Sequence, residues 1–362
     1  MFIFSYSYNS PRNKQANGIA HHIMDNSNKD ALSKARVLVM GKRGGILRWP
    51  EQVVIGCQKL GVPVQFLALN HQNSKDRLIK RGKGLISKRW QEHHLEQQLE
   101  RTMEKFQPNL VIFPDIINLS QPVHRCLLNL KSNFTGVSWI GDFFPDSIQA
   151  YNDIVDRFYF TDSYLQQQAL QQGLHLPSYL PLAVDTDYFC QYAQPWQQRD
   201  SAILFVGAFS TNRYQLIGEI EQPITIYGKN WNKPLPPQHQ VHPQNISLNQ
   251  VAGLYGSHKF VLNIMNKSNI SNGLNMRCFE ATAAGAVLVS DQAQDMTSCL
   301  EPDKDLLCYQ QVTDINNIVM LPDDQLRQIA QNGKNTTLNH HSYVHRVAKI
   351  ITDCIGTTHG SN

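Results

Sequence analysis

The segment from Ser271 to Ser290 combines a glycine-containing loop, a short helix and charged residues of both signs. The helix is expected from about Leu274 to Ala284, because Gly285 is a typical C-terminal stop. Arg277 and Glu280 are three positions apart, so they share a helix face near its amino end. A carboxylate there can accept the two hydroxyls of a ribose, while the arginine and the helix start hold phosphates. The alternative is an exposed Arg–Glu pair that contributes roughly a few tenths of a kcal/mol.

A second candidate follows the apolar run Ala202 to Val206, which is expected to be a strand ending at Gly207. The next residues form a tight turn that opens a helix, and Arg213 stands near the amino end of that helix. Backbone N–H groups at a helix start and a guanidinium both favour an anion, so the turn suits a phosphate. Many such turns carry glycine and arginine for structural reasons alone, and the motif is therefore weak by itself.

The elements that must position these residues alternate between strand and helix along the whole chain. In the first half, apolar runs predict strands at 36–40, 62–69, 110–113, 135–140 and 158–160, with helices between them. In the second half, strands are expected at 202–206, 224–227, 260–264 and 286–290, and the Pro-rich stretch 234–243 is interpreted as a loop. This alternation indicates two α/β domains with mostly parallel sheets, whose ligands bind at the carboxyl ends of the strands.

Length and composition agree with two domains. The 362 residues, 41% of them hydrophobic, exceed what one compact core usually takes. The polar segment 191–200 has no period and is the best linker candidate. The expected parts are a polar lead-in at 1–34, a first α/β domain at 35–190, the linker at 191–200, a second α/β domain at 201–345, and a C-terminal helix and tail at 346–362.

Charge and cysteine content narrow the function classes. The net charge of +4 gives no global argument for nucleic acid, but seven basic residues and one acid lie between Lys75 and Arg89. A solvated surface is the plain interpretation of that stretch, and an anionic acceptor or membrane surface is the other. The seven cysteines form no C-x-x-C pair, so they indicate core residues in a reducing, cytoplasmic setting. Neither a signal peptide nor a membrane span is expected.

Metal chemistry has little support in the sequence. Asp185, Thr186 and Asp187 form a literal D-x-D, a pattern that binds Mn²⁺ or Mg²⁺ in some transferases, but here it occupies what looks like an ordinary turn. The histidine pairs at 21–22, 93–94 and 340–341 have no zinc spacing with other ligands and are interpreted as surface or helix residues.

Taken in order, several segments resemble the group 1 glycosyltransferases of the two-Rossmann-domain (GT-B) fold, and especially their CgeB-like, spore-protein branch. The resemblance covers about 158–351 well and the first 140 residues only by their strand–helix alternation. The matching segments are YFTDSYLQQQALQQGLHLPSYLPLAVDTDYF, ILFVGAFSTNR, ITIYGKNW, LYGSHKFVLNI, GLNMRCFEATAAGAVLVS and HHSYVHRVAKII.

The resemblance implies a hexosyltransferase-like enzyme that uses a nucleotide-diphosphate sugar, with retention of configuration and without a metal or other cofactor. Glu280 matches the carboxylate that holds the ribose, and Arg213 matches a basic residue on the donor diphosphate. Arg277 and Asn275 match polar positions lining the same cleft, and Gly207 closes the strand beside it. The diphosphate would leave through an oxocarbenium-like state, with its charge held by the two arginines and helix N–H groups.

Two positions depart from the family pattern. Asn272 stands where the wider family has a glutamate eight residues before the ribose carboxylate, and Ala208 stands where an arginine is usual. These departures leave open a GT-B domain that binds or assembles without catalysis. Another enzyme on the same fold, such as a nucleotide-sugar epimerase, is the third hypothesis.

On the acceptor side, the candidates are Gly44 and Gly45, in the loop from Gly41, and Asp142, all at predicted strand ends. Asp142 is a candidate for orienting an acceptor hydroxyl, and an ordinary turn aspartate is the alternative. The acceptor itself is not specified. A glycan, a lipid-linked glycan or another anionic molecule is expected, with peripheral contact at the inner membrane face as a further possibility raised by the basic stretch.

Overall fold

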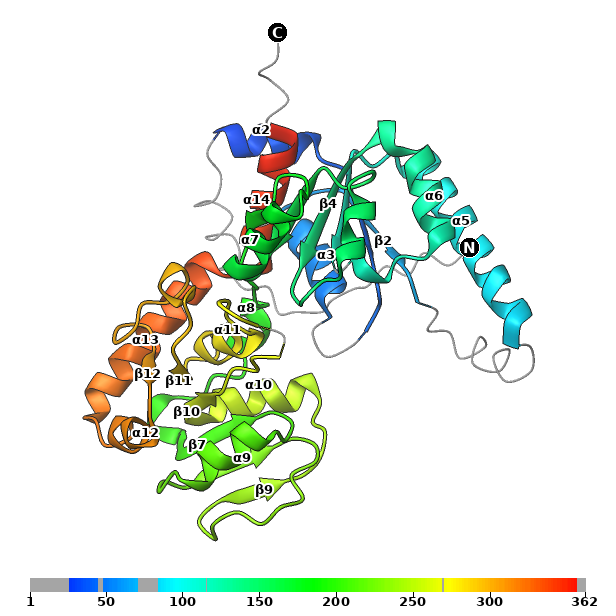
Figure 1. Cartoon of the computed structure of the whole chain (residues 1–362). Helices are drawn as coiled ribbons and strands as arrows, with labels where there is room; N and C mark the ends of the chain where they lie inside the picture. Colours follow the sequence, from blue (N-terminus) through cyan, green and yellow to red (C-terminus); the bar gives the residue numbers. More distant parts are fainter. Residues whose placement is uncertain (1–25, 45–47, 71–83, 115, 269, 357–362) are drawn as a thin grey trace.

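The computed structural model describes residues 26–44, 48–70, 84–114, 116–268 and 270–356. Two six-stranded sheets run through these residues, one in each half of the chain, and every described strand pair within them is parallel. The two halves lie apart in Figure 1 and are joined through α8 (Thr186–Cys190) and the long C-terminal helices. The predicted pair of α/β domains with parallel sheets is confirmed.

The first sheet has the strand order β2-β1-β3-β4-β5-β6. Its strands are β1 (Val37–Gly41), β2 (Val64–Ala68), β3 (Leu110–Pro114), β4 (Thr135–Ile140), β5 (Arg157–Phe160) and β6 (Ser178–Tyr179). The helices of this half are α2 (Asn26–Lys34), α3 (Trp49–Lys59), α5 (Gly84–Phe106), α6 (Gln121–Asn129) and α7 (Ser163–Gln171). Short 3-10 turns occupy Ile116–Asn118, Lys131–Asn133 and Asp146–Tyr151.

Alternate residues of the first sheet enter different cores. Val37 and Val39 pack with α3, whereas Leu38 and Met40 pack with α5 and α6. Successive side chains of a strand point to opposite faces, so a run that is buried at every position requires cover on both sides. That requirement explains why β1 reads as an unbroken apolar run rather than as an alternating pattern.

The second sheet has the order β12-β11-β10-β7-β8-β9. Its strands are β7 (Asp200–Val206), β8 (Ile224–Tyr227), β9 (Gln240–His242), β10 (His258–Asn263), β11 (Val287–Asp291) and β12 (Leu307–Tyr309). Its helices are α9 (Thr211–Gly218), α10 (Leu248–Ser257), α11 (Met276–Ala283), α12 (Val312–Ile318) and α13 (Asp323–His340). Short 3-10 turns lie at Trp196–Gln198 and Met296–Ser298.

The interpretation of 234–243 as a loop is wrong at its end, because β9 pairs there with β8. Three residues are too few to show a period, so no pattern could indicate this strand. The segment predicted as linker is also packed against the second half. Trp196 joins the core of that half, and the Arg199 guanidinium donates to the carbonyls of Gly285 and Ala284 at 2.6 and 2.9 Å.

The chain returns to its first half at the end. Helix α14 (Tyr343–Ile355), red in Figure 1, packs against α3 and α2. The predicted polar lead-in therefore includes a helix, α2, whose Ala31 and Leu32 are buried. The buried guanidinium of Arg346 fastens α14 by donating to the carbonyls of Pro181 and Leu182 at 2.7 and 3.0 Å. The two halves thus share one continuous apolar cluster.

His341 does not fit its interpretation as a surface residue. It is buried just before α14, and its Nε2 lies 2.7 Å from the carbonyl oxygen of Cys299. Burial and the nearby Arg346 lower the pKa of His341 to about 3, so the ring is neutral. Five of the seven cysteines are buried and none is bonded to another, as expected for core residues.

Candidate functional site

The turn after β7 is shaped by a glycine. A Cβ on Gly207 would lie 2.8 Å from the ring of Phe205, closer than real Cβ contacts allow. The carbonyl of Gly207 accepts a hydrogen bond from Trp231 Nε1 at 2.8 Å, and this bond holds the turn in place. Ser210 then begins α9, because its side chain accepts the Arg213 N–H at 3.3 Å. The predicted turn and helix start are therefore present.

Arg213 extends from α9 across the carboxyl end of the second sheet. Its guanidinium donates to the carbonyls of Ala208 and Ile264 at 2.9 and 3.3 Å, and its Cζ lies 5.5 Å from the centroid of the Phe205 ring. Burial and the neighbouring Arg277 lower the pKa of Arg213 to about 10, so the group still carries its charge at neutral pH. A desolvated cation beside another cation is an arrangement that a bound anion would relieve.

Arg277 reaches the same place from α11. It donates to Asn263 Oδ1 at 2.5 Å and to the carbonyl of Val206 at 2.6 Å, and its Cζ lies 5.3 Å from the centroid of the Phe205 ring. Its Nε is buried and has no hydrogen-bond partner among the described residues. A guanidinium has five N–H donors, and the bonds given above use two on each arginine, so both have donors left for a ligand. Asn275 also donates to Asn263 Oδ1, at 2.8 Å.

Asp291 is an acid close to both arginines. Asp291, at the end of β11, partly offsets their charge, but its two carboxylate oxygens accept the Met265 N–H at 3.2 and 3.1 Å. The arginines and this acid stand at the carboxyl ends of neighbouring strands, where open parallel sheets bind their ligands. Asp291 therefore leaves part of the positive charge of the two arginines unbalanced, and a bound polyanion would balance it.

Glu280 lies one turn beyond Arg277 on α11. Burial raises the pKa of the Glu280 carboxyl to about 7, and the charge of Arg277 opposes that rise without cancelling it. The residue keeps part of its surface accessible. Within the described part of the chain no hydrogen bond or ion pair holds its carboxyl. A carboxyl group without a protein partner has its oxygens available to the hydroxyl groups of a ligand.

The acceptor-side candidates lie at the carboxyl edge of the first sheet. Gly44 has φ 83° and donates its N–H to Glu51 Oε1 at 2.7 Å, whereas Gly45 lies outside the described residues. Asp142 is exposed in the turn after β4. The structure thus places Gly44 and Asp142 on one edge, and Arg213, Arg277, Asn275 and Glu280 on the edge of the other sheet.

The residues that connect these two edges were not predicted from the sequence. Asp162, just after β5, accepts the backbone N–H groups of Ser271, Asn272 and Gly273, which lead into α11. The side chain of Asn272 donates to Ser163 Oγ at 2.9 Å. The position that departs from the family pattern therefore bonds to the opposite half. Nothing local in the sequence indicates the distant partners of Asp162.

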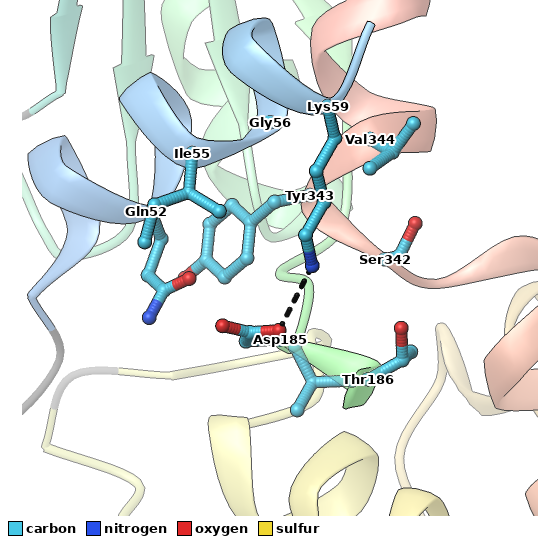
Figure 2. A pocket seen from close by; sticks show the side chains of 10 residues that line it. Gln52, Ile55, Gly56, Lys59, Asp185, Thr186, Ser342, Tyr343 and Val344 are labelled. Carbon is cyan, nitrogen blue, oxygen red and sulfur yellow. Dashed lines mark hydrogen bonds and ion pairs between the residues drawn. The ribbon is translucent and has the colours of Figure 1, made fainter. Parts of the chain in front are cut away.

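The D-x-D segment lies elsewhere, at the junction of α3, α8 and α14. Figure 2 shows Lys59 pointing at Asp185 in a small pocket that both residues line. Lys59 Nζ is 3.2 Å from Asp185 and 3.0 Å from Asp187, so one lysine pairs with both acids. Asp185 also caps α8. No group of three or more His, Cys, Asp or Glu side chains in the described ranges is arranged to hold a metal.

Of the basic stretch between Lys75 and Arg89, residues 75–83 lie outside the described residues, and the remainder starts α5 without described side chains. None of the helices within the described ranges is long and apolar enough to cross a membrane.

Comparison with known structures identifies the architecture. A glycosyltransferase from Rickettsia africae is similar over 90% of this chain and 100% of its own, with a TM-score of 0.64 and 10% identity. A trehalose 6-phosphate synthase from Burkholderia multivorans gives a TM-score of 0.59 over 88% and 98% at 10% identity. Anabaena HepE in complex with UDP and glucose gives 0.56 over 87% and 98%, also at 10% identity. The chain has the GT-B fold.

Residues 207–352 match the family model described as glycosyl transferase-like. The matched region contains Gly207, Arg213, Asn275, Arg277 and Glu280. No curated protein matches the sequence. The family match and the GT-B fold together support sugar transfer as the activity.

Proposed function

We propose that this GT-B protein transfers a sugar from a nucleoside diphosphate donor to an acceptor hydroxyl. The observation that carries the proposal is the pair of guanidiniums, Arg213 and Arg277, which share the Phe205 ring at the carboxyl edge of the second sheet. Together they supply two positive charges and several open N–H donors. A diphosphate has the charge and the oxygens to satisfy them.

Each donor group has a matching site residue. Arg213, Arg277 and the start of α11 face the diphosphate, and Gly207 lets the Phe205 ring and the Arg277 guanidinium pack closely against the turn. Asn275 holds Asn263 in place beside Arg277. Glu280, which has no bonded partner in the described structure, accepts the ribose hydroxyls.

The reaction breaks the bond between the sugar C1 and the diphosphate oxygen and forms a bond from C1 to the acceptor oxygen. The acceptor hydroxyl releases its proton to solvent, and the diphosphate leaves with the electron pair of the broken bond. Positive groups already in place stabilise that leaving charge without rearrangement. Retention of configuration, a hexosyl donor, independence from metal and membership of the CgeB-like branch are parts of this proposal that rest on the sequence resemblance.

Asp142 and the Gly44 turn form the acceptor side of the proposal. Asp142 is exposed at the end of β4, where it can orient a hydroxyl. A glycan or lipid-linked acceptor, and contact with an anionic membrane surface, follow only from the basic stretch between Lys75 and Arg89.

The test is turnover with a panel of nucleotide-sugars. Release of nucleoside diphosphate is measured with UDP-, GDP-, ADP- and dTDP-sugars, in EDTA, with and without a mixture of glycan and lipid-linked acceptors. We expect one nucleotide class to be consumed and the release to rise with acceptor. Arg277→Met is expected to lose this activity, while Arg36→Met retains it, because the Arg36 guanidinium contacts the carbonyl and the ring of Phe106 in the first half.

A second candidate is a GT-B subunit that binds a nucleotide-sugar without transfer. Asn272 favours it, because its side chain is already bonded to Ser163 and so does not act as a second carboxylate toward the donor. Binding of a nucleotide-sugar without release of diphosphate under any acceptor would support this candidate and contradict the transferase.

A further inference from the structure

The two carboxylate oxygens of Asp162 accept hydrogen bonds from different parts of the chain. Oδ1 accepts the Tyr164 N–H at 2.9 Å and so caps α7. Oδ2 accepts three successive backbone N–H groups from the second half of the chain, at 2.8, 2.9 and 3.0 Å, donated by Ser271, Asn272 and Gly273. A helix cap needs only the first oxygen, so the second contact requires another explanation.

The contact is buried and reinforced. Asp162 is 1% exposed, and hydrogen bonds between a carboxylate and N–H groups are shorter and stronger than neutral ones. Next to it, Asn272 donates to Ser163 Oγ at 2.9 Å, and Ser163 donates its N–H to Asp295 Oδ2 at 2.8 Å. Asp295 in turn donates its N–H to the Asn272 carbonyl at 3.0 Å, which closes a ring of bonds.

The loop can approach Asp162 because it contains a glycine. A Cβ on Gly273 would lie 2.6 Å from the carbonyl oxygen of Thr161 and 3.2 Å from the Cα of Asp162. Any side chain at 273 would therefore push the loop away from β5. The loop backbone must lie this close to β5 for its three N–H groups to reach one oxygen of Asp162.

The loop 271–273 leads directly into the donor residues. Asn275 follows Gly273 by two positions and stands at the N-cap position of α11, and Arg277 follows by four. A displacement of the loop would move the start of α11, and with it the N–H groups and the guanidinium. The first half of the chain thus reaches the donor site through the backbone of this loop.

We propose that Asp162 is a positioning residue, which fixes the donor loop 271–273 when the two halves are together and thereby sets the affinity for the nucleoside diphosphate. This proposal rests on the proposed function, since it assumes that Arg277 and the start of α11 bind the donor. Asp162 acts through the loop and does not contact the reacting atoms.

The test compares three variants with the wild type. Asp162→Thr retains a good helix cap but removes the charge and the second oxygen, and Asp162→Asn keeps the size but loses the charge. Asp156→Asn is the matched control, because Asp156 also accepts a backbone N–H, from Gly136, and lies away from the loop. Hydrogen exchange is followed for the peptide spanning 271–273, and calorimetry measures the Kd for UDP, GDP and ADP.

We expect exchange in 271–273 to become at least about tenfold faster in both Asp162 variants, and the nucleotide Kd to rise about tenfold, since roughly that factor follows from the loss of one charge-assisted contact. Exchange in α7 should stay unchanged in Asp162→Thr, and Asp156→Asn should alter neither quantity. Unchanged loop exchange, or faster exchange with an unchanged Kd, would overturn the positioning role.

If an Asp162 variant does not fold, Gly273→Ala tests the same contact from the other side. It leaves Asp162 intact but forces the loop away from Thr161, so the same two changes are expected, and their absence would contradict the proposal. If no nucleotide binds even the wild type, the proposed function fails and the positioning role fails with it. The exchange result then still decides whether Asp162 holds the loop.

Discussion

Arg213 and Arg277 come from different helices but lie on one aromatic ring, with guanidinium carbons 5.5 and 5.3 Å from the centroid of Phe205. Each is held in place by backbone carbonyls at the ends of β7 and β10, not by a carboxylate. Two fixed cations with unused N–H donors form a preorganised site for a polyanion. The repulsion between the two guanidiniums is already overcome when the protein folds, so it does not weaken binding.

Inorganic pyrophosphate tests this pair without assuming a nucleotide or a sugar. We expect it to raise the Tm of the wild type, because a ligand that binds only the folded state stabilises it by mass action. Arg213→Met and Arg277→Met should each remove most of that rise, whereas Arg36→Met should not. An equal rise in all four proteins would show that pyrophosphate binds elsewhere.

Glu280→Gln should change the pH dependence of stability in a specific direction. The pKa of Glu280 is raised from 4.5 to about 7, so the folded state holds the proton more tightly than the unfolded state. The contribution of Glu280 is therefore fully present below pH 4.5 and is lost as the pH rises through 7. The neutral glutamine escapes this loss, which amounts to about 3 kcal/mol at most.

Urea unfolding of both proteins between pH 4.5 and 8.5 measures the effect. The difference between Glu280→Gln and wild type isolates this group from the histidines, which titrate equally in both. We expect the variant to gain stability relative to wild type above pH 7 and to match it near pH 4.5. A difference that is constant with pH would contradict the raised pKa.

Much of the fold could be predicted from the sequence because both sheets are covered on both faces. Strands β1 and β7 each contain a continuous apolar run that ends at a glycine, and that pattern is local. The packing of segment 191–200 and the helix α2 could not be predicted from the sequence. Arg199 and Ala31 are buried by elements far away in sequence, and a polar composition hides such contacts.

The candidate site divides in the same way. The spacing of Arg277 and Glu280 predicts that they lie on one face of a helix. The turn after a strand predicts that Arg213 lies near a helix start. The roles of Phe205, Asn263 and Asp162 could not be predicted, because they depend on which strands are neighbours and on how the two halves meet. Asp162 bonds to residues more than 100 positions away, and no period or local motif carries that information.

Arg346→Met should destabilise the whole protein rather than the donor site. It removes the donors to Pro181, Leu182 and His340, and leaves the buried carbonyl of Leu182 unsatisfied. We expect the free energy of unfolding in urea to fall by about 3 kcal/mol. Lys349→Met on the same helix removes only a largely exposed pair with Asp353 and should cost less than about 1 kcal/mol. Similar losses in the two variants would contradict the fastening role of Arg346.

Mn²⁺ should have no specific effect at the D-x-D segment, because Lys59 already pairs with Asp185 and Asp187. We expect neither Mn²⁺ nor EDTA to change the Tm of the wild type. Lys59→Met should lower the Tm, since it leaves the buried Asp185 without its cation. A rise in Tm with Mn²⁺ that Asp187→Asn abolishes would instead establish a metal site there.

Calorimetric titration of the full chain with UDP, GDP, ADP and dTDP in EDTA tests the central claim most directly, with the double variant Arg213→Met, Arg277→Met as the comparison. The account predicts that one of these nucleoside diphosphates binds the wild type and that the double variant binds it at least about 100-fold more weakly, as expected for two lost charge-assisted contacts. Equal binding to both proteins, or no binding to either, would contradict the placement of a nucleotide-sugar donor at the carboxyl edge of the second sheet.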